Sequence, residues 1–312
     1  MSWLNEEIDV EKLRLIISPS DVSVGRGPTI CGPTCIESPP WVDNQDGKFY
    51  LYFCHHDGKQ IYRASSDDVE GPWVVSPVPA LVLDDFQDAY DHIASPDIRV
   101  DYRSENVILY FHARARSRGR EQWTFAALSR DGKIFERYID TPIAPFYLRT
   151  FEFGSSLLGL SKGGNLLVKG HDSINFQMLG NLFDEKFDGE LWHNHAGAIR
   201  HVSIKLQDQV LTVFYSRIGD APECIYRTRF SLSGQSINEW RRSASFEEVL
   251  IIPERDYEGS RLPLVPSQSG PSEAPENALR DPYYFKTGGI EYLFYTVAGE
   301  SGIAVAKLVP GC

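Results

Sequence analysis

The sequence lacks the marks of several large classes of protein. No segment approaches the roughly 20 consecutive apolar residues that a membrane-spanning helix needs. The first seven residues, Met-Ser-Trp-Leu-Asn-Glu-Glu, contain neither the basic nor the apolar region of a signal peptide. Long amphipathic stretches with the 3.6-residue period of helices are absent too. These absences favour a soluble, cytoplasmic protein built from strands.

Positive charge is also scarce. The 312 residues include 31 Lys and Arg against 43 Asp and Glu, a net charge of −12. Such a surface repels nucleic acids and anionic membranes, so neither is an expected partner. Glycine fingerprints for dinucleotides, P-loops, GxSxG and HExxH motifs are missing. A small-molecule partner is therefore expected, whereas the oligomeric state is not determined.

Cysteine is present in an odd number and without CxxC spacing. The five residues are Cys31, Cys35, Cys54, Cys224 and Cys312. Reduced, mostly buried thiols are expected, because a disulfide framework or a zinc site would need paired spacings. Cys31 and Cys35 could begin a metal site, but no matching downstream pair follows. The His193-Asn194-His195 motif could bind a metal, yet a hydrogen-bonding role in a loop is favoured because no carboxylate flanks it clearly.

What the sequence has in abundance is short aromatic strands. Four segments align as FYLYF (49–53), VILYF (107–111), LTVFY (211–215) and EYLFY (291–295). Asp-Gly turns flank the first of them, which is typical of β-hairpins. The segments belong to repeats of roughly 40–60 residues, the period of propeller blades. We count five such units.

The repeats predict an all-β, five-bladed β-propeller formed by residues 1–312 as a single domain. The last unit has only three strands, and Leu13–Ser18 would supply the fourth, which would close the ring and protect its edge. A pair of β-sandwiches is the alternative. The innermost strands of the blades are expected to begin at five segments: 36–42, 92–100, 146–153, 200–205 and 279–285.

Each of these leading strands carries ionisable side chains. Since the innermost strands of a propeller line its axis, the groups should converge on one funnel. They are Glu37, His92, Asp97, Arg149, Glu152, Arg200, His201, Arg280 and Asp281.

Three short motifs carry a family resemblance. They are Ser95-Pro96-Asp97-Ile98 before the ILYF strand, Asp67–Trp73 at a blade edge, and Arg280-Asp281-Pro282. Together they resemble the blade patterns of glycoside hydrolase family 43 and its relatives in families 32, 62, 117 and 130. The resemblance covers most of the chain as a blade pattern. It implies a five-bladed propeller that hydrolyses glycosides.

The resemblance also implies roles for carboxylates. Family 43 enzymes are expected to use a base in the first blade, an Asp that tunes pKa values in the second and a Glu acid in the third. Asp97 and Glu152 match the second and third roles. The first blade has Ser38 before Pro39, where the family pattern has Asp, so Glu37 and Asp281 are the candidates for the remaining role.

Arginines, histidines and one glutamate are the candidate substrate-binding residues. Guanidinium groups bind carboxylates and phosphates bidentately, which suggests an anionic substrate. The alternative is that each arginine neutralises a neighbouring carboxylate. The candidates are His92, Arg149, Arg200, His201, Arg217, Glu223 and Arg280. No cofactor is required, although some relatives hold an axial cation, and calcium near His201 would be the equivalent.

The sequence therefore predicts a glycosidase that acts on a small glycoside, either neutral or anionic. Clustered carboxylates at the axis would supply the acid and the base that glycoside hydrolysis needs. Two other functions fit the same pattern. One is a lyase, isomerase or cyclase of small-molecule biosynthesis, and the other is a carbohydrate-binding propeller without catalysis.

Overall fold

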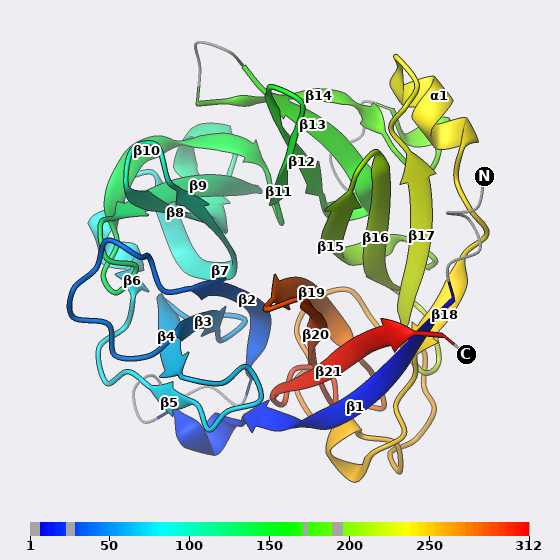
Figure 1. Cartoon of the computed structure of the whole chain (residues 1–312), viewed down its shortest axis with the longest axis horizontal. Helices are drawn as coiled ribbons and strands as arrows, with labels where there is room; N and C mark the ends of the chain where they lie inside the picture. Colours follow the sequence, from blue (N-terminus) through cyan, green and yellow to red (C-terminus); the bar gives the residue numbers. More distant parts are fainter. Residues whose placement is uncertain (1–6, 23–28, 171–173, 189–195, 312) are drawn as a thin grey trace.

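Five antiparallel sheets surround one axis (Figure 1). This computed structural model describes residues 7–22, 29–170, 174–188 and 196–311, so His193 and His195 lie outside the described residues. The sheets are the blades of a five-bladed β-propeller, which confirms the predicted fold. None of the helices in the described ranges is long and apolar enough to cross a membrane.

The first two blades use the chain up to residue 145. The first contains β2 (Cys31–Glu37), β3 (Phe49–Cys54), β4 (Gln60–Ser66) and β5 (Val74–Val75), with β6 (Leu81–Val82) also paired to β4. The second contains β7 (Ala89–Asp101), β8 (Asn106–Ala115), β9 (Gln122–Ser129) and β10 (Glu136–Pro145). In both, the chain runs outward from the axis strand by strand.

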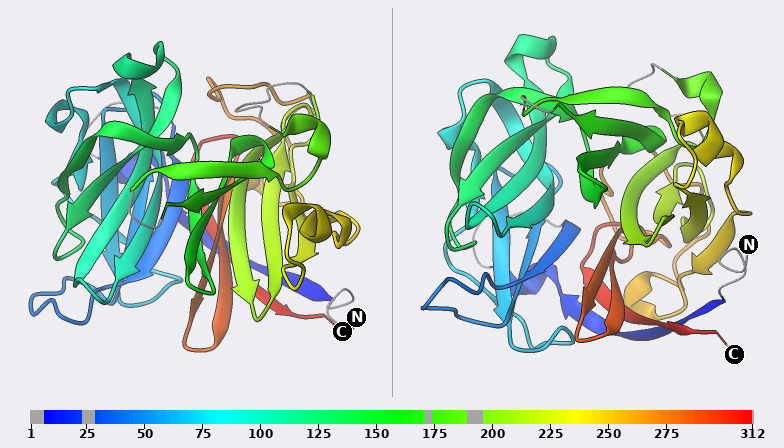
Figure 2. Two further views of the ribbon diagram at one scale, coloured as in Figure 1. Left: turned by 90° about the horizontal axis from the view of Figure 1, so that it is seen from above. Right: turned by 45° about the horizontal axis from the view of Figure 1, so that its top comes forward.

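The remaining blades follow the same plan. The third contains β11 (Arg149–Phe153), β12 (Ser156–Ser161), β13 (Asn165–Lys169) and β14 (Phe176–Asn181). The fourth contains β15 (Ile199–Gln207), β16 (Val210–Arg217), β17 (Ile225–Ser231) and β18 (Glu248–Ile251). The fifth contains β19 (Arg280–Thr287), β20 (Ile290–Thr296), β21 (Ile303–Pro310) and β1 (Ile8–Ile17). The helix α1 (Ile237–Arg242) lies at the outside of the ring, beside β17 (Figure 2).

An N-terminal strand completes the last blade. The strand β1 pairs antiparallel with β21, from Ile8 opposite Pro310 to Ile17 opposite Ile303. Figure 1 shows the two strands side by side at one edge of the ring. The prediction for Leu13–Ser18 is thus confirmed, and the strand begins five residues earlier than expected.

The aromatic second strands are buried on both faces. Along β3, Phe49, Leu51 and Phe53 pack toward the fifth blade, while Tyr50 and Tyr52 pack toward the second. Successive side chains of a strand point to opposite faces, so a strand between two neighbours must be apolar throughout. The apolar clusters of the described chain fill all five interfaces between blades.

The innermost strands share one irregularity. In β2, two residues, Gly32 and Pro33, face one residue of β3, because Cys31 pairs with Cys54 and Thr34 with Tyr52. Such a two-to-one β-bulge bends the strand and re-aims a side chain. The same bulge recurs in the other blades at Ser95–Pro96, Tyr147–Leu148, Arg200–His201 and Asp281–Pro282.

These bulges correct one strand assignment. The first leading strand was expected to begin at Ile36, but β2 runs from Cys31 to Glu37. Gly32 and Pro33 are residue types common in turns, yet they form a bulge inside the strand, with Gly32 at a φ of 65°. Glu37 therefore ends the strand instead of beginning it.

Candidate functional site

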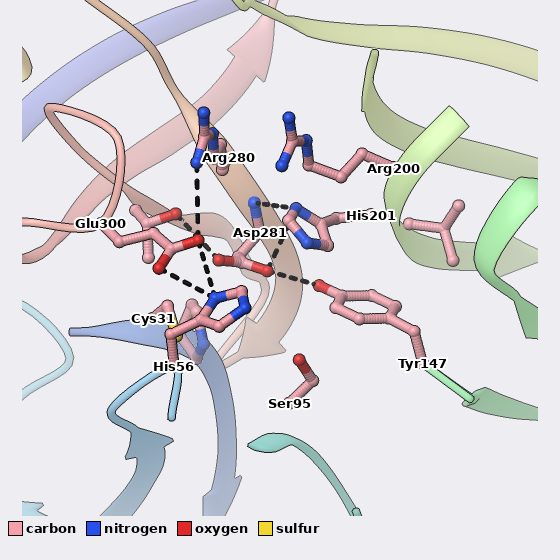
Figure 3. Close-up of polar contacts among 12 residues, drawn as sticks. Cys31, His56, Ser95, Tyr147, Arg200, His201, Arg280, Asp281 and Glu300 are labelled. Carbon is pink, nitrogen blue, oxygen red and sulfur yellow. Dashed lines mark hydrogen bonds and ion pairs between the residues drawn. The ribbon is translucent and has the colours of Figure 1, made fainter. Parts of the chain in front are cut away.

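The bulges converge at one end of the propeller axis. There, a cavity of about 140 Å³ is bordered by side chains from all five blades. Its walls also include Ser269 and Gly270, from the segment between the fourth and fifth blades. We call this cavity the axial pocket (Figure 3). Its polar side chains are Cys31, His56, Ser95, His112, Gln122, Tyr147, Lys162, Arg200, His201, Asp281 and Glu300.

Arg149 holds the bulges together from beneath. Its guanidinium donates to the backbone oxygens of Pro33, Pro96 and Val202, which belong to three other blades. It also donates to the Tyr147 hydroxyl at 3.3 Å. Arg149 is buried, and its donors are used by the protein, so its position suits a structural hub better than a substrate contact.

Asp281 is the carboxyl group that a bulge brings to the pocket. Its backbone φ is 47°, in the left-handed region that side chains other than glycine rarely adopt. Tyr147 donates its hydroxyl to Oδ1 at 2.9 Å, and Thr296 donates to Oδ2 at 3.1 Å. Burial, and then the negative charge of Glu300, raise the pKa of Asp281. A raised pKa favours a protonated carboxylic acid.

The imidazole of His201 lies directly against Asp281. Its Nδ1 lies 3.2 Å from Asp281 Oδ1 and accepts the backbone N–H of Asp281 at 3.4 Å. Burial and the charges of Arg200 and Lys162 lower the pKa of His201 well below its usual value. The imidazole is therefore neutral, and a proton on Asp281 allows its Oδ1 to face Nδ1 without repulsion. The Tyr147 ring packs against His201 with centroids 4.6 Å apart.

A second acidic group, Glu300, lies beside Asp281 in the pocket (Figure 3). Glu300 accepts from His56 Nδ1, at 3.1 Å to Oε1 and 3.0 Å to Oε2, and lies 3.5 Å from Arg280 Nη1. Although burial opposes the charge of Glu300, the hydrogen bond from His56 and the nearby arginines lower its pKa. Burial likewise opposes the charge of His56, yet Glu300 raises its pKa. The pocket thus has one carboxyl group whose pKa is raised, Asp281, and another whose pKa is lowered, Glu300.

The arginines beside the pocket are engaged by acids. Glu223 is fully buried between Arg200 Nε at 3.0 Å and Arg280 Nε at 2.8 Å. Arg280 also contacts Glu276 at 2.7 Å. Arg200 donates to the backbone of Gln268 and Gly270, which anchors that segment over the pocket. These contacts match the expectation that arginines neutralise neighbouring carboxylates.

Lys162 adds a cation to the pocket wall. Its Nζ lies over the Phe146 ring, 5.1 Å from the centroid. Burial, and then the charge of Arg200, lower the pKa of Lys162 to about 8. The amine is therefore mostly charged at neutral pH and loses its proton in mild base.

Other expected site residues lie away from the pocket. Glu37 is exposed and accepts from Thr287, while Glu152 is 69% exposed and paired with Arg99. Both stand near the far ends of their strands. Asp97 is buried and accepts from Thr150 N at 3.0 Å and Oγ1 at 2.9 Å, linking two blades.

Two further candidates have partners of their own. His92 is buried against His112, with ring centroids 5.7 Å apart, and its Nδ1 is 3.5 Å from Asp91. Arg217 contacts Glu247 at 2.5 Å and lines a separate surface hollow. Of the expected residues, Asp281, Arg200 and His201 border the axial pocket, with Arg280 and Glu223 directly behind them.

Eight of the eleven polar side chains named above were not predicted as site residues, among them Tyr147, Cys31, His56 and Glu300. Tyr147 occupies the third bulge, Cys31 precedes the first, and His56 and Glu300 lie in turns after the second strands β3 and β20. His56 and Glu300 could have been identified from the sequence, because each lies in the turn that follows the aromatic second strand of its repeat. Cys31 was not expected at the pocket, because its strand was predicted to begin at Ile36 and not at Cys31.

Comparisons with known proteins identify relatives at two levels. No model of a known protein family matches the sequence. The chain is 34% identical over 303 residues to the uncharacterized protein R118 of Acanthamoeba polyphaga mimivirus, covering 90% of this chain and 83% of that protein.

Solved structures share the fold at low identity. One is CoXyl43, a family 43 β-xylosidase/α-arabinofuranosidase from a compost microbial metagenome, in complex with xylotriose and in a calcium-free form. Its TM-score is 0.63, with 13% identity and 96% of both chains covered. Another is a family 43 enzyme from Xanthomonas citri with xylotriose, at a TM-score of 0.60 and 12% identity over 95% of this chain and 89% of that one. The chain thus belongs to the family of the mimivirus protein R118, and its fold is the five-bladed propeller of family 43 glycoside hydrolases.

Proposed function

We propose that the protein is a glycosidase that hydrolyses a small glycoside in the axial pocket, with Asp281 as the general acid. The observation that carries the proposal is a buried carboxyl group with a raised pKa, held at a bulge of a family 43-type propeller. Protonation of the leaving oxygen by such a group is the first requirement of glycoside hydrolysis. Glu300 and His56, which lie beside Asp281 in the pocket, are the groups that would activate water.

The pocket size supports a substrate with one buried ring. A cavity of about 140 Å³ approaches the roughly 150 Å³ that holds a benzene molecule in a protein core. It therefore suits one sugar ring and not a chain of several. The relatives of the same fold were solved with xylotriose, so pentosides are the first compounds to test.

An anionic group on the substrate would be bound by Lys162. The arginines expected for this role, Arg200 and Arg280, already bind Glu223 and other acids. Lys162 borders the pocket and is charged below pH about 8. A preference for a uronide over the matching neutral glycoside, lost in Lys162→Met, would support this part of the proposal.

Calcium near His201 has little support from the side chains around it. Calcium takes six to eight oxygen ligands, commonly carboxylates and carbonyls. His201 has one carboxylate in contact, Asp281, whereas the cations Arg200, Lys162 and Arg280 lower its pKa. This donor set does not fit calcium, and no step of the proposed reaction uses it.

A reducing, cytoplasmic location is part of the same proposal. The four cysteines in the described part of the chain are buried free thiols, as expected. The sulfur atoms of Cys31 and Cys54 lie 3.6 Å apart and form no disulfide bond, which suits a compartment that keeps thiols reduced.

Hydrolysis can be tested directly. Wild-type protein would be incubated with aryl β-xylosides and α-arabinofuranosides in H₂¹⁸O, and the released sugar analysed by mass spectrometry. Incorporation of one ¹⁸O atom is expected. Sugar release without label, or an unsaturated product, would favour the lyase alternative, and the absence of any turnover would favour a binding module.

A further inference from the structure

One wall of the axial pocket contains three side chains with different metal-binding atoms. Among the described residues, Cys31, His56 and Glu300 place a sulfur, a ring nitrogen and a carboxylate oxygen all within 4.8 Å of one another. Cys31 and Glu300 are buried, and His56 is partly buried. Figure 3 shows the three side chains grouped beside Asp281.

The backbone holds these three residues in place. Ile30, next to Cys31, donates its N–H to the backbone carbonyl oxygen of Glu300 at 2.6 Å and forms a parallel bridge with Ser301. The His56 N–H donates to Thr29 Oγ1 at 3.0 Å. The donors therefore come from three chain segments that main-chain contacts lock together. Such preorganisation is what a metal site requires of its protein.

The donor set selects the kind of ion. A thiolate, an imidazole and a carboxylate are the ligands that zinc takes, with ligand distances of about 2.0–2.3 Å, whereas calcium and magnesium prefer oxygen alone. We propose that Cys31, His56 and Glu300 form a binding site for one zinc ion in the wall of the axial pocket. Three protein ligands leave a fourth position open, which is the pattern of catalytic zinc sites.

Binding would rearrange few existing contacts. Tetrahedral zinc ligands stand about 3.5 Å apart, so donors already within 4.8 Å need only small movements. The His56–Glu300 hydrogen bond and the contacts of Cys31 Sγ with Cys54, at 3.6 Å to Sγ and 3.8 Å to the backbone oxygen, would be replaced by bonds to the ion. Arg280, which lies 3.5 Å from Glu300, keeps its closer contacts with Glu223 and Glu276.

The site occupies the position where the first blade lacks a carboxylate. Gly32, beside Cys31, is the equivalent of Asp281 in its bulge. A zinc-bound water would replace that missing group, because zinc lowers the pKa of bound water to about 7. The water would release a proton to solvent, and the hydroxide would bond to the anomeric carbon. The glycosidic C–O bond would break as the leaving oxygen takes the proton of Asp281. This catalytic consequence rests on the proposed function, whereas the binding itself does not.

Metal content and cobalt spectroscopy test the site. Full-length protein, stripped with a chelator, would be titrated with Zn²⁺ and with Co²⁺, and bound metal measured by mass spectrometry. One equivalent is expected, and the Co²⁺ form should show a sulfur-to-cobalt charge-transfer band. The band should disappear in Cys31→Ser and persist in Cys224→Ser, which replaces a buried thiol outside the pocket.

His56→Asn and Glu300→Gln should each weaken Zn²⁺ affinity at least tenfold. Absence of stoichiometric metal, or a charge-transfer band unchanged in Cys31→Ser, overturns the zinc site. Two outcomes separate this inference from the proposed function. Glycoside hydrolysis that survives complete metal removal refutes the catalytic role of the zinc ion and leaves the proposed glycosidase function standing. Stoichiometric zinc without turnover of any glycoside leaves the site standing and refutes the glycosidase.

Discussion

The two ends of the innermost strands differ in a way that locates the chemistry. At the upstream end, bulges place Ser95, Tyr147 and Asp281 in one pocket. At the downstream end, the strands are regular, and Glu37 and Glu152 stand exposed. About 17 Å separates Glu37 from Cys31, because their partners Phe49 and Cys54 are five residues apart on β3 and a strand rises about 3.3 Å per residue.

The difference shows that the position of a charge along a strand decides its role. A carboxylate at the regular end meets water and a single polar neighbour, Thr287 for Glu37 and Arg99 for Glu152, and such exposed pairs contribute little to stability. A carboxyl group at the bulged end is buried, so its pKa is raised. The repeat thus uses one end of each strand for the pocket and leaves the other to solvent.

The largest effect on stability is expected where the bulged end buries charge. Glu223→Gln leaves Arg200 and Arg280 with a neutral partner in a site closed to water. Breaking a buried pair costs about 3–5 kcal/mol. Urea unfolding of the variant and wild type measures the loss. A loss below about 1 kcal/mol would mean that these charges are not structural.

At Lys162, we expect a pH-dependent contribution of about 3 kcal/mol to the free energy of unfolding. Its pKa falls from 10.5 to about 8 on folding, so the unfolded chain binds more protons between these values. Wild-type stability should therefore rise, relative to Lys162→Met, as pH increases from about 8 to 10.5. Below pH 8 both states of wild type carry the charge, and the difference should be constant. If the unfolding free energies of the two proteins changed in parallel with pH, this would contradict a lowered pKa for the buried Lys162 amine.

A smaller effect is expected at the bulge of the first blade. Gly32 and Gly288 both have positive φ, 65° and 57°. A Cβ on Gly32 would lie 3.0 Å from Ser95 Cα, whereas one on Gly288 meets nothing within 4 Å. Gly288→Ala should cost about 1 kcal/mol for its backbone conformation, and Gly32→Ala at least twice that. Equal losses in urea unfolding would show that the bulges do not pack closely.

The smallest effect is expected at the regular end. Glu152→Gln removes an exposed pair with Arg99, and exposed pairs contribute about 0–1 kcal/mol. The unfolding free energy should therefore change by less than about 1 kcal/mol. A larger loss would give this end a structural role comparable to that of Glu223.

The sequence allowed the ring to be predicted because its signal is local. Aromatic segments such as FYLYF recur at one place in each repeat and are buried on both faces, and the unpaired last unit indicated closure by the N-terminal strand. The pocket was harder to predict, because Gly32-Pro33 resembles a turn by composition although it forms a bulge inside β2. That error moved the first leading strand by five residues and directed attention to Glu37.

The rest of the site depends on contacts between distant segments. Asp281 was identified from its Asp-Pro motif, but its partners Tyr147 and His201 come from other blades. The His56–Glu300 pair joins residues 244 positions apart. No local pattern specifies such pairings, since they follow from the order of the blades around the ring.

One comparison of rates tests the central claim, which is that the active site lies at the bulged ends of the innermost strands. Initial rates would be measured on the best aryl glycoside for Asp281→Asn and for the double variant Glu37→Gln/Glu152→Gln, with folding checked by urea unfolding. Loss of a general acid predicts a fall of about 10²–10⁴-fold for Asp281→Asn, and the double variant should match wild type. An active Asp281→Asn beside an inactive double variant would contradict the account.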